Sequence, residues 1–211
     1  MLRKFARFIF IILNKILFRF EVINKEKLPV KGPAILVANH QHAFDISIIH
    51  CTSKPWVYWV AKKELIDKPV LGYFVKRMGV LPVDRKKNDL SVAKSIYEKI
   101  KAEEVIGIFP QGTRVKNPEM ISRIIPKTGA VHFALKTKVP VIPIGITNTF
   151  RIFGKIRVTV GDPIDFYNVP ENTQGNNEII KMTIHMMKEI YKLADIDYKI
   201  DNSLLEAGND E

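Results

Sequence analysis

The chain has 211 residues, 46% of them hydrophobic, which is enough to bury one good core but few for two. A single cysteine, Cys51, excludes an intrachain disulfide framework and favours a reducing compartment. The net charge is +11, and because residues 195–211 contribute −5, the remaining body carries about +16. Such a surface favours anionic partners, but charge alone does not distinguish nucleic acid, anionic lipid and an acidic carrier.

The first twenty residues hold five basic side chains and no acidic one. Their longest uncharged run, Phe8 to Asn14, is far shorter than the roughly 20 residues that span a bilayer, and no secretory cleavage site follows it. In a helix, one side would hold Phe5, Ile9, Ile12, Leu13, Ile16, Leu17 and Phe20, with the basic residues opposite. We expect residues 1–20 to form an amphipathic helix at a membrane interface; packing of this helix on its own domain is the alternative.

After Phe20, short apolar runs alternate with longer amphipathic stretches. The apolar runs predict strands over residues 20–24, 34–39, 57–61, 80–84, 105–109, 139–146 and 155–161. The amphipathic stretches predict helices over residues 43–52, 64–77, 89–103, 127–137 and 176–193, the third capped by Asn88 or Asp89.

Fully apolar strands such as AILVA and VIGIF suit a sheet that is covered on both faces. We therefore predict an α/β fold with a mostly parallel central sheet flanked by helices. One domain would span residues 21–194, between the N-terminal helix over 1–20 and a frayed acidic tail over 195–211.

Polar clusters follow three of the predicted strands. NHQHAFD follows AILVA, DRKKND follows GVLPV, and PQGTR follows VIGIF. The carboxyl ends of parallel strands meet at one edge of a sheet, and ligands bind there in α/β folds. We expect the three clusters to form one basic rim.

The stretch FPQGTR has the composition of an anion cradle. Pro110 and Gly112 predict a tight turn, and Gly112 has no side chain to keep a ligand from the backbone amides. Thr113 can donate a hydroxyl, and Arg114 presents a planar fork that matches phosphate or carboxylate oxygens. Arg85 in DRKKND adds a second guanidinium. The alternative is an ordinary loop in which Arg114 pairs with a nearby acid.

In NHQHAFD, His40 and Asp45 are five residues apart, a spacing that does not align them on one helix face. His40 would lie in the strand-to-helix turn, with Asp45 on the first helical turn reaching back to one imidazole nitrogen. The other nitrogen could then take a proton from a hydroxyl. A metal site remains an alternative because His40 and His42 form an H-x-H unit, although such sites need further ligands.

Four blocks, in order, resemble the glycerolipid acyltransferases, most closely the bacterial 1-acylglycerol-3-phosphate acyltransferases. NHQHAFD is similar to the family's NHxSxxD block, GVLPVDR to its Gly-hydrophobic-Asp-Arg block, FPQGTR to its FPEGTR block, and VPVIPIGI to its final Pro-containing strand. The resemblance covers about residues 20–165. Two positions depart from it: His42 replaces the usual serine, and Gln111 replaces the usual glutamate.

This resemblance implies a glycerol-3-phosphate acyltransferase-like fold and a transferase of phospholipid biosynthesis. A fatty acyl group would pass from acyl-coenzyme A or acyl carrier protein to the sn-2 hydroxyl of lysophosphatidic acid. His40 would be the general base and Asp45 its orienting partner. The substrate-binding residues would be Arg85, Gln111, Gly112, Thr113 and Arg114.

The same resemblance implies no metal and no organic cofactor, with the acyl thioester as co-substrate. The expected partners are a lysophospholipid and a membrane surface, without nucleic acid, at the cytoplasmic face of the cell membrane as a peripheral or monotopic protein. Because Gln111 lacks the charge of glutamate, another lysophospholipid or glycerol-3-phosphate stays open as the acceptor. The alternatives from other classes are a metal-dependent hydrolase and a non-catalytic protein that binds anionic membranes.

Overall fold

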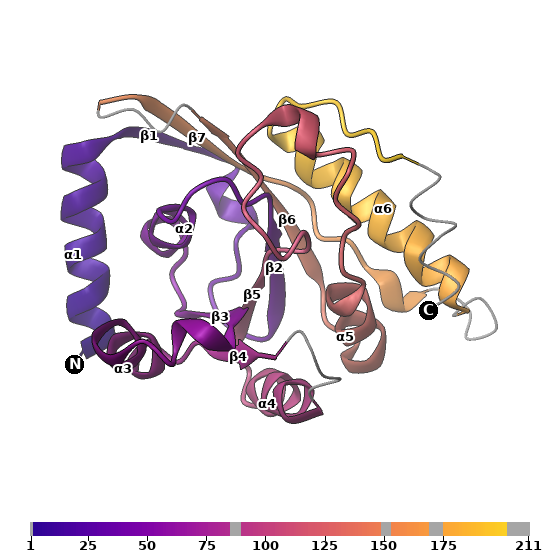
Figure 1. Ribbon diagram of the computed structural model, residues 1–211, viewed down its shortest axis with the longest axis horizontal. Coiled ribbons are helices and arrows are strands. Elements are labelled where there is room, and N and C mark those ends of the chain that lie inside the picture. The colour runs from indigo at the N-terminus through magenta and orange to yellow at the C-terminus, as the bar shows by residue number, and fades with distance from the viewer. Residues whose placement is uncertain (1, 85–89, 149–152, 169–174, 202–211) are drawn as a thin grey trace.

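A seven-stranded sheet forms the centre of the computed structural model, which describes residues 2–84, 90–148, 153–168 and 175–201 (Figure 1). The strands are β1 (Arg19–Ile23), β2 (Ala34–Ala38), β3 (Val57–Lys62), β4 (Leu81–Val83), β5 (Val105–Ile108), β6 (Val141–Asn148) and β7 (Lys155–Val160). Their order across the sheet is β1-β7-β6-β2-β5-β3-β4. Neighbours are parallel except β6 and β7, which pair antiparallel.

Within the described ranges, six α-helices cover both faces of this sheet. They are α1 (Leu2–Leu17), α2 (Asp45–Thr52), α3 (Pro69–Met78), α4 (Leu90–Lys101), α5 (Gly129–Thr137) and α6 (Asn176–Leu193). In Figure 1, α1, α2 and α3 lie on the left of the sheet, and α5 and α6 lie on the right. One buried cluster joins the sheet to α4, α5 and α6, and a second joins it to α2.

The fold predicted from the sequence is confirmed, since every expected strand and helix is present. The helix expected over 64–77 is shorter at its start: a 3-10 turn covers Lys63–Leu65, and α3 begins at Pro69. Proline has no N–H to donate to a preceding turn, so it begins a helix and does not continue one. The caps expected at Asn88 and Asp89 lie outside the described residues.

The two chain ends differ from their predicted boundaries. The N-terminal helix ends at Leu17, and β1 already begins at Arg19. Residues 195–201 pack on the domain and are not frayed, because Tyr198 is buried and stacks on Tyr191 of α6. The rest of the acidic tail, 202–211, is not among the described residues.

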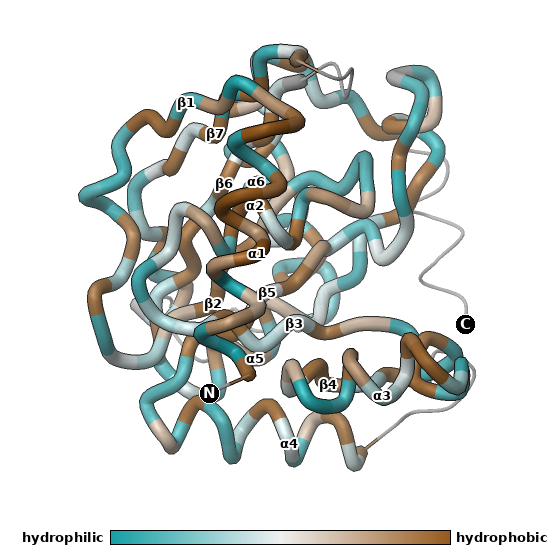
Figure 2. Tube along the Cα trace, turned by 90° about the vertical axis from the view of Figure 1, so that its left-hand side faces the viewer, coloured by the Kyte–Doolittle hydropathy of each residue, from teal (hydrophilic) through white to brown (hydrophobic). Residues whose placement is uncertain are grey.

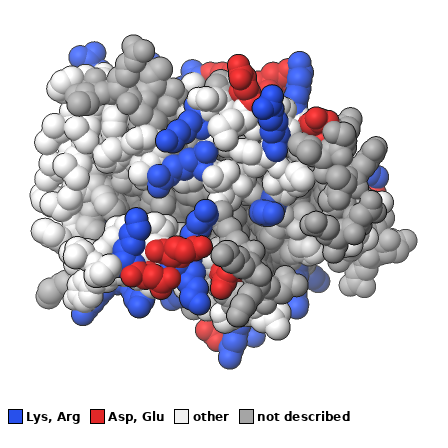
Figure 3. Space-filling model, in the orientation of Figure 1, with Lys and Arg blue, Asp and Glu red and all other residues white. Residues whose placement is uncertain are grey.

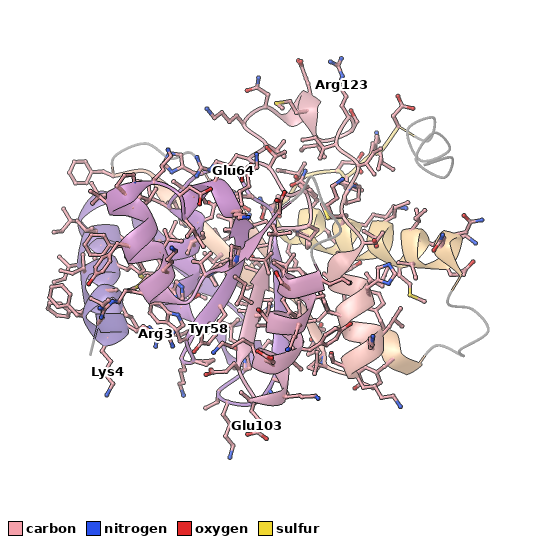
Figure 4. All side chains as sticks on the ribbon, turned by 60° about the horizontal axis from the view of Figure 1, so that its bottom comes forward. Arg3, Lys4, Tyr58, Glu64, Glu103 and Arg123 are labelled. Carbon is pink, nitrogen blue, oxygen red and sulfur yellow. The ribbon has the colours of Figure 1, made fainter. Side chains whose placement is uncertain are left out.

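Helix α1 turns its polar side toward the domain. Asn14 is buried and donates from Nδ2 to the Ser47 hydroxyl of α2 at 3.1 Å. Arg3 donates to the Tyr58 hydroxyl at 2.5 Å, and Figure 4 shows these two side chains next to each other while Lys4 points away. Five large apolar side chains of α1 remain exposed on its other side: Phe5, Phe8, Ile12, Leu13 and Ile16. No helix among the described residues is long and apolar enough to cross a bilayer.

Candidate active site

The motifs at the ends of β2 and β5 meet at the carboxyl edge of the sheet. Figure 4 shows this edge at the top, marked by Glu64 after β3 and Arg123 after β5, with Glu103 on the opposite edge. The strands β2 and β5 are neighbours in register, so the segments that follow them run side by side. The Val115 N–H donates to the His40 carbonyl at 2.7 Å and fastens the two segments together.

His40 and Asp45 form a hydrogen-bonded pair at this edge. Asp45 is the first residue of α2 and is fully buried, and its Oδ2 lies 2.8 Å from His40 Nδ1. The same oxygen accepts the backbone N–H groups of Gln41 and His42 at 2.8 and 2.9 Å. Because a carboxylate oxygen only accepts, His40 Nδ1 is the donor in this pair, and in the neutral imidazole Nε2 then keeps its lone pair.

Two aromatic rings support the imidazole of His40. The ring of Phe109 stacks on it with centroids 3.9 Å apart and planes 13° apart. Trp59 in turn stacks on Phe109 at 4.5 Å and 15°. The sequence patterns did not predict this stack, because the contact of Trp59 with Phe109 depends on strand pairing that a local motif does not reveal.

His40 faces a cavity of about 430 Å³ with a basic wall. Its polar lining is His40, Lys62, Gly112, Thr113, Arg114 and Lys116. Four of the predicted site residues therefore line this cavity, and Lys62 and Lys116 are additions that the sequence patterns did not single out. The predicted Arg85 lies outside the described residues. Figure 3 shows Lys and Arg side chains across the middle of the face onto which this edge opens.

The turn expected at FPQGTR is present. Gly112 has a φ of 66°, in the left-handed region that glycine adopts without strain, and its N–H donates to the Phe109 carbonyl at 2.8 Å. Thr113 and Arg114 are exposed beyond this turn, where their side chains can reach a ligand.

Gln111, predicted among the substrate-binding residues, points into the protein instead. It is only 4% exposed, does not line the His40 cavity, and accepts a hydrogen bond at Oε1 from the Tyr191 hydroxyl of α6 at 2.8 Å. Burial raises the pKa of Tyr191, so this phenol stays a donor. A neutral amide suits this site, because a buried carboxylate would have to lose its hydration.

A second cavity of about 430 Å³ adjoins the first and shares Val60, Phe109 and Gly112 with it. Its further lining is mostly apolar and includes Val83, Val92, Ile96, Ile108 and Phe133. The cavity that holds His40 and the basic side chains thus shares a wall with a mainly apolar one.

Two further residues complete the turn after β2. Asn39 is buried and exchanges two hydrogen bonds with the backbone of Ile146 on β6, at 2.8 and 2.9 Å. The His42 ring stacks on Phe44, while its backbone N–H donates to Asp45 Oδ2. Within the described part of the chain, no three His, Cys, Asp or Glu side chains gather in a way that could hold a metal ion.

Known proteins resemble this chain in sequence and in fold. Residues 19–147 match a family model described as Acyltransferase. A 1-acyl-sn-glycerol-3-phosphate acyltransferase of Bacillus subtilis is 30% identical over 76% of this chain and 86% of its own length. One from Helicobacter pylori is 33% identical over 62% of this chain, and one from Saccharomyces cerevisiae is 29% identical over 81%. The matched regions span 56% and 60% of those two relatives.

A solved structure resembles the whole fold. The crystal structure of the 1-acyl-sn-glycerophosphate acyltransferase PlsC from Thermotoga maritima superposes with a TM-score of 0.66 at 23% identity, covering 91% of this chain and 78% of that one. The family model spans more than half of the chain, and its matched residues contain both His40 and the FPQGTR turn. The chain belongs to the acyltransferase family.

Proposed function

We propose that this protein is a 1-acylglycerol-3-phosphate O-acyltransferase, which moves a fatty acyl group from a thioester to the sn-2 hydroxyl of lysophosphatidic acid and makes phosphatidic acid. The observation that carries the proposal is that His40, paired with the buried Asp45, faces a cavity that also holds Arg114. Relatives named for this reaction support the choice of acceptor.

In the proposed reaction, His40 Nε2 removes the proton of the sn-2 hydroxyl as its oxygen attacks the thioester carbonyl. The new C–O bond forms, the C–S bond breaks, and the proton passes from His40 to the departing thiolate. Asp45 holds the tautomer and stabilises the imidazolium between these two transfers. Every step uses groups of the chain and its substrates, so no cofactor is required.

The acceptor phosphate would lie against the turn after β5. Arg114 offers a bidentate fork, Thr113 a hydroxyl, and Gly112 an approach to the backbone without a side chain in the way. Lys62 and Lys116 add positive charge to the same cavity. Arg85 remains part of the proposal from the resemblance alone. The mainly apolar cavity beside Phe109 would receive the acyl chain of the donor.

A lipid substrate requires access from a bilayer, and α1 and α3 provide an apolar face for it. The exposed large apolar side chains are Phe5, Phe8, Ile12, Leu13 and Ile16 on α1 and Val70, Leu71, Tyr73 and Phe74 on α3. The two helices contact each other, and Figure 2 looks onto the side that carries them. The same side is the left edge of Figure 3, where uncharged residues predominate. Monomeric proteins rarely expose so many apolar side chains without a binding partner.

We infer peripheral docking of this face on the cytoplasmic leaflet, aided by the basic charge of the body. Because Asn14 and Arg3 tie α1 to the domain, point variants test this better than deletion. The double variant Phe5→Ser/Phe8→Ser should bind phosphatidylglycerol vesicles at least tenfold more weakly, while Leu90→Ser, an exposed position on α4, should bind normally. Equal vesicle binding by the two variants would contradict docking through this face.

The acceptor is tested with purified protein, an acyl thioester and a panel of lysophosphatidic acid, lysophosphatidylcholine and glycerol-3-phosphate, following free thiol. We expect lysophosphatidic acid to be preferred, and Arg114→Ala to raise its KM with little change in kcat. Preference for a lysolipid without a phosphate monoester, or an unchanged KM in Arg114→Ala, would contradict the assignment.

A further inference from the structure

Strand pairing places Trp59 flat over a glycine. Trp59 on β3 is the register partner of Gly107 on β5 and is only 1% exposed. A Cβ at Gly107 would come within 2.7 Å of two carbons of the indole, a distance that forces something to shift. Gly107 therefore leaves the space into which the Trp59 ring fits.

Phe109 follows Gly107 by two residues, so the two positions lie on the same face of the sheet. This spacing brings the Phe109 ring alongside the indole, with centroids 4.5 Å apart, and His40 stacks on Phe109 at 3.9 Å. The stack thus runs from the buried core to the site, through Trp59, Phe109 and His40.

We propose that Trp59, seated over Gly107, is a positioning residue for acyl transfer and acts on His40 through Phe109. The inference rests on the proposed function, because it assigns Trp59 to the orientation of the base in that reaction. Trp59 itself lines neither of the two cavities at the site.

The stack supplies what the hydrogen bond to Asp45 lacks. A bond at Nδ1 fixes one point of the imidazole, but the plane of the ring can still tilt around that point. Near-parallel contact with Phe109, held from behind by Trp59, fixes the plane and therefore the direction of Nε2. The aromatic face also favours the positively charged ring that forms when His40 takes the substrate proton.

Trp59 is held by packing alone, which makes its removal a clean perturbation. Its indole N–H is buried and has no hydrogen-bond partner among the described residues. Substituting Trp59 therefore takes away ring contacts without breaking a hydrogen bond.

The kinetic test compares Trp59→Leu, Trp59→Phe and Val57→Ala. Val57 is a matched control, since it is buried on the same face of β3 but belongs to no ring contact of the stack. We expect Trp59→Leu to lower kcat about 10- to 100-fold with the acceptor KM within about twofold, because a small misplacement of a catalytic group has effects of this size. Trp59→Phe should recover most of kcat, and Val57→Ala should keep it. An unchanged kcat in folded Trp59→Leu, or the same loss in Val57→Ala, would overturn the proposal.

A spectroscopic test needs no turnover and so separates this inference from the proposed function. The ring protons of His40, assigned by their loss in His40→Ala, should resonate upfield in the wild-type protein because they lie over the Phe109 ring. They should move downfield in Phe109→Leu, and partly so in Trp59→Leu. If the His40 ring signals do not move in either variant, the stack does not determine the orientation of the His40 ring, whatever the activity of the enzyme.

Discussion

Replacing Asp45 by asparagine tests how the carboxylate assists His40. The two backbone amides of Gln41 and His42 donate to the same oxygen as the imidazole, so an acceptor has to remain there. The asparagine oxygen can take this place, with its NH₂ group where Oδ1 now lies. The tautomer of His40 is thereby retained and only the charge is lost.

The size of the effect follows from that geometry. A charge pair about 4 Å apart at an effective dielectric constant near 20 interacts by about 4 kcal/mol, and exchange of a charged for a neutral acceptor weakens one hydrogen bond by about 1 to 2 kcal/mol. We therefore expect Asp45→Asn to lose about 1.5 to 4 kcal/mol of transition-state stabilisation, or roughly 10- to 1000-fold in kcat.

The assay is thiol release from an acyl thioester with saturating lysophosphatidic acid, with chemical unfolding as the control for a folded protein. Asp45→Ala, which leaves two backbone amides and the imidazole without their acceptor, should lose more activity and more stability than Asp45→Asn. A wild-type rate in Asp45→Asn would refute the electrostatic role. A loss of activity in Asp45→Asn as complete as that in His40→Ala would show that asparagine does not retain the His40 tautomer.

Three further predictions concern groups around the site. Tyr191→Phe removes the hydroxyl that donates to the Gln111 amide oxygen. This variant should lower the free energy of unfolding by about 1 kcal/mol in denaturant titrations and raise the acceptor KM. An unchanged KM would show that this contact with α6 does not influence acceptor binding. Asn39→Ala leaves the backbone N–H and C=O of Ile146 without their hydrogen-bond partner and should lower the free energy of unfolding by about 2 to 4 kcal/mol. A loss near zero would contradict this pairing. Burial lowers the pKa of His50 to about 3 from 6.5, so the unfolded chain binds the proton first as pH falls and stability drops below pH 6.5. Between pH 7 and 5 this amounts to about 2 kcal/mol, which His50→Phe should largely remove in unfolding measured at both pH values; an equal loss in the variant would contradict it.

The elements of the fold were predictable because their signals are local. Apolar runs such as AILVA and VIGIF become strands buried between two helical layers, and the residues after them reach one edge by parallel pairing. The His40–Asp45 pair was predictable for the same reason, since both residues belong to one turn and its helix. A proline inside a helical pattern was also a local signal, and the start of α3 at Pro69 follows from it.

The features that sequence reasoning missed depend on distant contacts. Gln111 turns inward because Tyr191, 80 residues later, offers a buried hydroxyl. The support of His40 by Trp59 depends on the register of β3 against β5, which no single segment specifies. The amphipathic pattern of α1 was evident, but which side meets the domain was settled by the polar partners of Arg3 and Asn14.

The most direct test of the central claim is the product balance of the wild-type protein and His40→Ala with lysophosphatidic acid vesicles and an acyl thioester. We predict one phosphatidic acid, acylated at sn-2, for each thiol released by the wild-type protein, and no transfer by a folded His40→Ala. Thiol release without phosphatidic acid, or transfer that survives the loss of the imidazole, would contradict it.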